Sequence, residues 1–221
     1  MNEQDTRRKI IDLCLEMNAT GLNQGTSGNI SARWEEDMLI TPSGVPYGDL
    51  EPDAIVRMRI DDDAYEWRGD FKPSSEWHFH RAILAAKPEQ GAIVHTHSTF
   101  ATVLSIGRRD IPACHYMIAA FGGSTVRCAE YATFGTPALS ENILAAMEGR
   151  SACLLATHGM IACGKDLDKA MWAAVELETL SRQYYHALQL DGMEILDDDE
   201  MAVVIEKFKS YGPTRPAAND G

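Results

Sequence analysis

The sequence predicts an α/β protein with one domain, built on a central, largely antiparallel sheet with helices packed on both faces. Helical and strand-like segments are mixed without the strict β–α–β alternation of a parallel sheet. Several neighbouring strand-like segments also lie close enough in sequence to form hairpins. The chain has 221 residues and no linker-like break. We therefore expect one domain over 1–211 and a disordered, polar tail over 212–221.

Composition limits the partners and the compartment. A net charge of −13 disfavours nucleic acid or an anionic membrane as a partner, although a local pocket can still accept a small phosphorylated substrate. No apolar run approaches the ~18–20 residues of a membrane span, and residues 1–8 lack the layout of a signal peptide. The five cysteines are scattered without a CxxC pair, so we expect free thiols and a cytoplasmic protein.

The first half of the chain is predicted to contain two helices with strands between them. Apolar residues at 10, 11, 14, 15 and 17 form a helical stripe over Arg7–Met17. The second helix is expected to end at about Ala86, before Lys87-Pro88, and to have Ser74 or Ser75 as its N-cap. The strands expected between these helices are 29–34, 38–41 and 55–60.

The second half continues the same mixture of helices and strands. A short apolar strand is expected around Ile93 and Val94, and Ser98 is expected to cap the helix that follows it. The further elements expected are strands at 126–129, 152–158 and 160–163, a helix from Pro137, a long helix over 167–190 and a last helix over 197–209.

The segment Gly21–Ser31 is rich in glycine and in small hydroxyl and amide side chains. It can be a simple turn between a helix and a strand. It can also be a phosphate cradle, because glycines let backbone N–H groups approach an anion while Thr26, Ser27 and Asn29 add donors. The segment alone leaves both interpretations open.

Three histidines lie at the ends of predicted strands. His95 and His97 are two residues apart, so their side chains point to the same side of a strand. His158 follows the apolar run that begins at Ala152. Three imidazoles with an acidic residue nearby match the ligand count of a catalytic zinc site that keeps an open position.

The start of the helix after Pro73 also allows two interpretations. Serine and glutamate in the first turn are typical of a well-capped helix. Alternatively, the hydroxyls and N–H groups bind phosphate while Glu76 points at the metal. His78 and His80 lie two apart on this helix and cannot share a face, so we expect structural or exposed positions for both.

With these motifs in hand, the chain resembles the class II aldolase and adducin-head family from about Arg8 to Gly212. Co-linear blocks of this kind are far more specific than any one motif. The matching stretches are Gly-Leu-Asn-Gln-Gly-Thr-Ser-Gly-Asn-Ile-Ser (21–31), Leu-Ile-Thr-Pro-Ser-Gly (39–44), Pro-Ser-Ser-Glu-Trp (73–77), His-Thr-His (95–97), His-Tyr-Met-Ile-Ala-Ala (115–120), Tyr-Ala-Thr-Phe-Gly-Thr (131–136), His-Gly-Met-Ile-Ala-Cys (158–163) and Glu-Lys-Phe-Lys-Ser-Tyr-Gly (206–212).

The resemblance implies a set of site residues. His95, His97 and His158 would hold Zn²⁺, with Glu76 as a fourth ligand in the resting site, although such ligands also tolerate Mn²⁺ or Co²⁺. The positions that match phosphate-binding residues of the family are Gly28, Asn29, Ser43, Gly44, Ser74 and Ser75. The family's aldolase pattern of Thr-Gly is here Ser43-Gly44, which keeps the hydroxyl, and its His-His pair is here Thr157-His158.

The resemblance also implies an assembly and a reaction. Members of the family form homotetramers with active sites between subunits, so Tyr116, and Tyr211 with it, would act on a neighbouring subunit. Phe134, Phe208 and Tyr211 match residues around an aldehyde. The implied reaction is the reversible cleavage of a ketose 1-phosphate, L-fuculose 1-phosphate or a related 5-deoxyketose 1-phosphate, into dihydroxyacetone phosphate and an aldehyde. Glu76 would move the proton at C3 and Tyr116 the proton of the C4 hydroxyl.

Other activities of the same fold remain as alternatives. A sugar-phosphate 4-epimerase is disfavoured by Glu at position 76 and by Tyr rather than an acid at position 116. A dehydratase or decarboxylase can share Glu76 and the three histidines. A non-catalytic, adducin-like interaction module would not need to retain every ligand and the base. The sequence does not fix the aldehyde half of the substrate.

Overall fold

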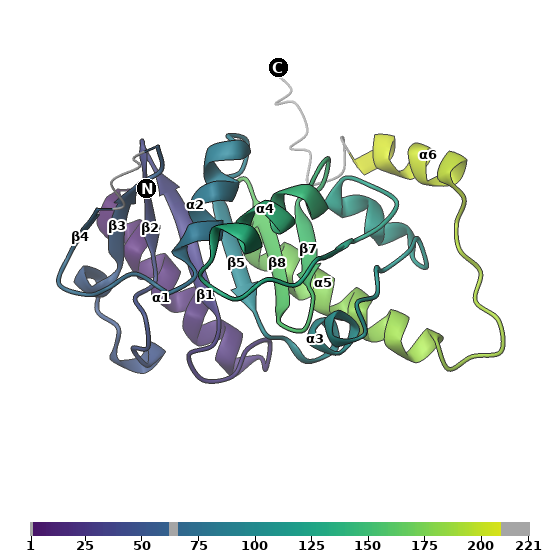
Figure 1. The fold of residues 1–221 in the computed structure, drawn as a ribbon, viewed down its shortest axis with the longest axis horizontal. Helices are drawn as coiled ribbons and strands as arrows, with labels where there is room; N and C mark the ends of the chain where they lie inside the picture. The colour runs from purple at the N-terminus through teal and green to yellow at the C-terminus, as the bar shows by residue number, and fades with distance from the viewer. Residues whose placement is uncertain (1, 62–65, 209–221) are drawn as a thin grey trace, which may run out of the picture.

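The computed structural model describes residues 2–61 and 66–208. The predicted tail and Tyr211 lie outside these residues, so the domain boundary at 211 stays a prediction. Within the described ranges, a single eight-stranded sheet has the order β4-β3-β2-β1-β5-β8-β7-β6 (Figure 1). Its strands are β1 (Asn29–Trp34), β2 (Asp37–Ile40), β3 (Val56–Arg59), β4 (Trp67–Arg68), β5 (Ala92–Thr96), β6 (Cys128–Ala129), β7 (Ala152–Leu155) and β8 (Gly159–Gly164).

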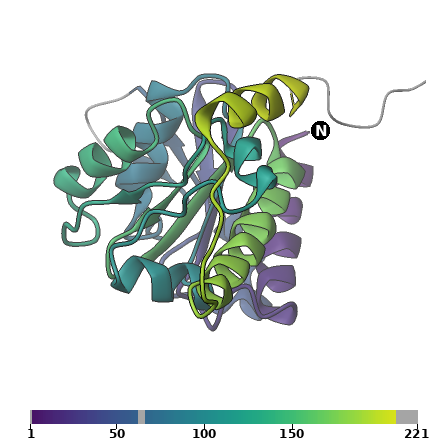
Figure 2. The same ribbon diagram turned by 90° about the vertical axis from the view of Figure 1, so that its right-hand side faces the viewer.

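The predicted fold class is confirmed. Neighbouring strands pair antiparallel except at one edge, where β6 and β7 are parallel. In the view along the sheet, α1 and α5 cover one face while α2 and α4 cover the other (Figure 2). The helices are α1 (Glu3–Ala19), α2 (Trp77–Ala86), α3 (Thr99–Ile106), α4 (Pro137–Ala146), α5 (Leu167–Ala187) and α6 (Asp198–Phe208), with the 3₁₀ helices η1 (Tyr47–Asp49), η2 (Pro52–Ala54) and η3 (Tyr116–Phe121).

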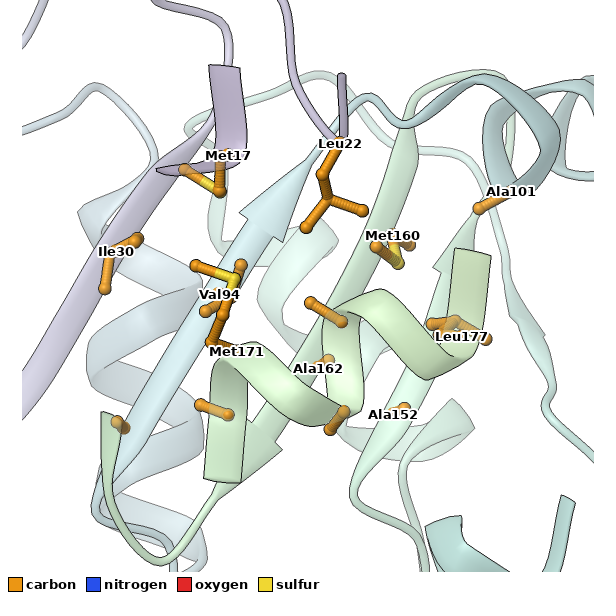
Figure 3. Close-up of a cluster of buried hydrophobic side chains, with 14 of the residues drawn as sticks. Met17, Leu22, Ile30, Val94, Ala101, Ala152, Met160, Ala162, Met171 and Leu177 are labelled. Atoms are coloured by element: carbon orange, nitrogen blue, oxygen red, sulfur yellow. The ribbon is translucent and has the colours of Figure 1, made fainter. Parts of the chain in front are cut away.

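The two faces of the sheet carry two separate hydrophobic cores. Val94 of β5 and Ile30 of β1 belong to the core under α1 and α5, which Figure 3 shows. Ile93 belongs to the second core, which contains Phe79 of α2 and Ile143 of α4. Because side chains alternate along a strand, the residue after Val94 shares the face of Ile93. The side chain at position 95 is therefore directed toward α2.

Among the predicted boundaries that differ from the structure, two lie at the site. Helix α2 begins at Trp77 without a side-chain cap, rather than after an N-cap at Ser74 or Ser75. The hydroxyl of Ser74 instead accepts the N–H of Glu76 at 3.3 Å within a turn. Strand β7 ends at Leu155, and the chain turns before His158 through Thr157, whose φ of +56° is rare for a β-branched residue.

Ser98 occupies the N-cap position of α3, but its side chain does not cap that helix. Its hydroxyl donates to Glu178 of α5 at 2.7 Å. Glu178 itself accepts the N–H groups of Phe100 and Ala101, each at 2.9 Å. A carboxylate from α5 thus caps α3 and stabilises the segment that follows His97.

Two further sequence expectations concern membrane spans and cysteines. None of the helices in the described residues combines the length and the apolar character needed to cross a membrane. The five cysteines all lie in described segments and are free thiols.

Because β8 packs closely against α5, we expect substitution of Gly164 to destabilise the protein. A Cβ at Gly164 would lie 2.3 Å from the backbone nitrogen of Ala170 and 2.6 Å from the carbonyl carbon of Lys169. We expect Gly164→Ala to lower the free energy of unfolding by about 1–3 kcal/mol, measured by urea denaturation. Gly48→Ala is the matched control, because a Cβ there meets nothing within 4 Å. Equal stabilities of the two variants would contradict the proposed packing.

Candidate active site

Three imidazoles converge where the central strands of the sheet end. His95 on β5 lies opposite Asn29 of β1 and Ile161 of β8. His97 follows two residues later, and His158 lies in the turn before β8. The three residues place one ligating nitrogen each within 4.8 Å of one another, a group that could hold a metal ion. The structure therefore brings together the three histidines that the sequence singled out.

Glu76 completes this group from the start of α2. Its carboxylate oxygens lie 3.2 Å from His95 Nε2 and 3.0 Å from His158 Nε2. His95 Nδ1 lies 2.8 Å from the carbonyl oxygen of Met160, which places the proton on Nδ1 and leaves a lone pair on Nε2.

Two buried atoms of this group, His95 Nε2 and one carboxylate oxygen of Glu76, lack a hydrogen-bond partner. Both are electron-pair donors, and a buried polar atom without a partner costs free energy. Two acceptors at 3.2 Å repel unless a cation, either a proton or a metal ion, lies between them. Three imidazoles and a carboxylate are ligands that a divalent metal prefers. The residues present therefore fit a metal.

The electrostatic environment favours the metal-binding protonation states. Burial alone would raise the pKa of the Glu76 carboxyl. Positive charge and hydrogen bonds on the side of His95 and His158 outweigh burial and hold that pKa well below its ordinary value. Burial, the larger cause, and the neighbouring His95 and His158 together lower the pKa of His97 to about 4. A carboxylate and a neutral imidazole are the forms that ligate metal.

A row of buried polar side chains lies behind Glu76. Asn29 Nδ2 donates to the Glu76 carboxylate at 2.9 Å. The Oδ1 atom of Asn29 lies 2.5 Å from His80 Nε2, and His80 Nδ1 lies 2.7 Å from the hydroxyl of Ser31. For His80 the sequence predicted only a structural or exposed position, whereas the side chain is fully buried and is linked to the site.

A cavity of about 400 Å³ opens beside His97 and His158. Two serine-containing loops line this cavity, one around Ser43 and one around Ser74. An isolated β-bridge between Pro42 and Pro73 holds them side by side, and Ser43 N donates to Lys72 O at 3.0 Å. The residues that the sequence predicted for this site and that line the cavity are Gly28, Asn29, Ser43, Gly44, Ser74, Ser75, Glu76, His97, Phe134 and His158.

Two glycines in these loops occupy positions that a larger residue would disfavour. A Cβ at Gly28 would lie 2.9 Å from the carbonyl oxygen of His95, so a side chain would push the loop away from β5. Tyr47 fixes the same loop by donating its hydroxyl hydrogen to Gly28 O at 2.5 Å. Gly44 has a φ of +72°, a conformation that glycine adopts at little cost.

The described residues that line the cavity include neither lysine nor arginine. An anion bound there would be held by hydroxyl, amide and backbone N–H donors and by the metal. Sequence reasoning did not assign Tyr131 or Thr157 to the site, although both line the cavity. Tyr131 begins one of the matched sequence blocks, which was the available signal, whereas the chain turn at Thr157 had none.

Apart from the metal-ligand group, two predicted residues in the described part of the chain are not brought to the cavity within this chain. Among the described residues, Tyr116 and Phe208 are absent from the cavity lining. Their rings lie near each other instead, with centroids 6.4 Å apart, and Tyr116 is half exposed. Tyr211 lies outside the described residues.

Comparisons with known proteins agree with this geometry. Residues 8–185 match the model of the class II aldolase and adducin N-terminal domain. A 5-methylthioribulose-1-phosphate/5-deoxyribulose-1-phosphate aldolase from Rhodospirillum rubrum is 53% identical over 96% of both chains. An L-fuculose phosphate aldolase from Escherichia coli is 49% identical over 96% of this chain and 98% of that one. A solved L-fuculose 1-phosphate aldolase structure superposes with a TM-score of 0.88 at 39% identity, covering 93% of this chain and 96% of that chain.

The fold and the site together are those of a protein with the fuculose aldolase architecture and a three-histidine metal site. The chain belongs to the class II aldolase and adducin N-terminal domain family.

The buried His80 predicts a pH dependence of stability. Burial lowers its pKa to about 3 from an ordinary 6.5. Between these values the unfolded chain binds more protons at this residue than the folded chain, so the free energy of unfolding falls as the pH drops from 6.5 toward 3. We expect His80 to contribute about 1.4 kcal/mol per pH unit in that window. Urea denaturation of the metal-free protein measures the slope. His80→Gln should remove this contribution, and an unchanged slope in the variant would contradict it.

Proposed function

We propose that this protein is a zinc-dependent aldolase. It cleaves a ketose 1-phosphate, L-fuculose 1-phosphate or a related 5-deoxyketose 1-phosphate, reversibly into dihydroxyacetone phosphate and an aldehyde. The observation that carries the proposal is the group of three imidazoles and one carboxylate at the cavity, where a cation is needed between Glu76 and His95. The two aldolases at 53% and 49% identity support the same reaction class.

The site can bind the substrate at two ends. His95, His97, His158 and Glu76 would hold the metal, which when bound supplies Lewis-acid stabilisation of the negative charge that develops on the substrate oxygens. The loops around Gly28, Ser43-Gly44 and Ser74-Ser75 supply N–H and hydroxyl donors for the phosphate. Holding the phosphate fixes the reacting bond relative to Glu76, which contributes to the rate through orientation.

Glu76 is the proton carrier at C3 in this proposal. Its carboxylate lines the cavity and is ionised when the neighbouring imidazoles surround it. In the condensation direction the ionised carboxylate removes a proton from C3 of dihydroxyacetone phosphate. In the cleavage direction the carboxyl group first takes up a proton from solvent and then gives it to C3 of the dihydroxyacetone phosphate half.

Tyr116 handles the proton of the C4 hydroxyl from a neighbouring subunit. Its half-exposed ring lies off the cavity of its own chain, which supports action in trans. The protein is then a homotetramer with active sites between subunits. Phe134 lines the cavity and, with Phe208 and Tyr211 from the C-terminal region, would enclose the aldehyde. Free thiols support a cytoplasmic location.

The aldolase proposal predicts a specific loss in Glu76→Gln. Release of dihydroxyacetone phosphate from a panel of fuculose and 5-deoxyribulose 1-phosphates should fall by about 10²–10⁴-fold, because the amide cannot carry the proton. A coupled assay measures release, with metal content determined in parallel. Glu89→Gln, the same chemical change at an exposed position, should keep the wild-type rate. No release from any substrate by the zinc-loaded wild type would exclude the aldolase and favour the epimerase or dehydratase reaction.

The position of Tyr116 predicts complementation between two inactive variants. Tyr116→Phe and Glu76→Gln should each be slow alone. Mixed oligomers should recover activity, because a Glu76→Gln chain supplies an intact Tyr116 to the site of a Tyr116→Phe chain. Assay of co-expressed and separately expressed chains measures the recovery. If mixed oligomers form without any gain in activity, Tyr116 does not act in trans.

A further inference from the structure

The row of polar side chains behind Glu76 is buried along its whole length. Ser31 and His80 are fully buried, and Asn29 and Glu76 are only 4% and 5% exposed. The four side chains come from β1 and from the beginning and second turn of α2. Each is linked to the next by a contact of 2.5–2.9 Å. Such a fully connected polar row in a protein interior has one preferred arrangement.

The direction of every hydrogen bond in this row follows from Glu76. An ionised carboxylate only accepts hydrogen bonds, so the NH₂ group of Asn29 must face it. Asn29 Oδ1 then faces His80, which requires Nε2 of His80 to donate. A neutral imidazole has one donor nitrogen, so Nδ1 accepts the hydrogen of the Ser31 hydroxyl. The lowered pKa of His80 agrees with the neutral form.

We propose that His80 is a positioning residue for Glu76, acting through the amide of Asn29. The proposal rests on the proposed aldolase function, because it gives His80 the role of orienting the carboxylate that exchanges the C3 proton. The His80 Nε2–H group selects the Asn29 orientation that directs NH₂ toward Glu76. The second N–H of that amide remains available to the cavity, which Asn29 lines.

Packing alone does not explain this residue. The two orientations of an asparagine amide have nearly the same shape and differ in which group faces the neighbour. Without a donor at position 80, a flipped amide would present Oδ1 to the Glu76 carboxylate. Two acceptors would then face each other, and the carboxylate would turn away from His95 and His158. His80 also lies one helical turn after Glu76, so α2 carries both groups on one side.

Two amide substitutions separate the positioning role from a structural one. In His80→Gln, the side-chain NH₂ group can take the place of Nε2 and donate to Asn29. In His80→Asn, the shorter side chain reaches only the place of Nδ1, so the link to Ser31 can be kept while the link to Asn29 is lost. Both variants put a similar polar group at the same buried position. His78→Asn on the same helix is a control for the substitution itself, and circular dichroism checks folding.

Two readouts are measured for each variant. One is the exchange of the C3 proton of dihydroxyacetone phosphate with deuterated solvent, followed by NMR without any aldehyde. The other is zinc affinity, measured by competition with a chelator. We expect His80→Asn to lower both by at least about tenfold, as found for residues that orient a metal ligand. His80→Gln and His78→Asn should stay within about threefold of the wild type.

Each combination of results either supports or overturns the positioning role of His80. Loss in His80→Asn with rescue in His80→Gln supports the positioning role. Equal loss in both variants, or no loss in His80→Asn, overturns it. If neither variant folds, Ser31→Ala takes their place. Because it removes the donor that fixes the tautomer, a fall in exchange of at least about threefold supports the role and an unchanged rate overturns it. If the wild type exchanges no C3 proton, the aldolase proposal fails while zinc affinity still tests the positioning.

Discussion

The requirement for a cation between Glu76 and the imidazoles governs the arrangement of the site. A carboxylate oxygen and an imidazole lone pair that face each other at 3.2 Å in the interior are unfavourable by themselves. The surrounding structure holds them there: Met160 O fixes the ring of His95 from behind, and Asn29 holds the carboxylate. The fold thus maintains a local arrangement that becomes favourable when the cation binds, which is a common way to build a metal site.

The sheet makes this arrangement rigid by using both of its faces. On β5, Val94 and Thr96 point toward α1 and α5, while His95 points toward α2 and α4. Thr96 donates its hydroxyl hydrogen to Leu22 O at 2.6 Å and so fixes the glycine-rich loop from the opposite face. One strand therefore positions two of the proposed metal ligands, His95 and His97, and anchors the loop proposed to bind phosphate. This explains why the loop lies at the cavity although it precedes β5 by many residues.

The sequence was most informative where a short periodic pattern decides geometry. The period of two along a strand placed His95 and His97 on one side, and hairpin spacing indicated the antiparallel sheet. The start of α2 was wrong because Ser74 forms a local turn with Glu76, which competes with capping. His80 was missed because it was compared with His78, two residues away, rather than with Glu76, one helical turn before it. The approach of Thr157-His158 depends on a tight chain turn that no sequence pattern indicated. The proposed role of Tyr116 requires a second subunit and was implied only by the family resemblance, not by the residues themselves.

The most direct test of the cation requirement is X-ray absorption spectroscopy at the zinc edge, combined with metal analysis of the purified protein. The proposed zinc site predicts one zinc ion per chain, with three imidazole nitrogens at about 2.0–2.1 Å and a carboxylate or water oxygen as the remaining ligand. Loss of one nitrogen ligand in His158→Ala would assign that position. A protein that retains no metal, or one whose zinc has sulfur ligands or fewer than three imidazoles, would contradict the proposed metal site.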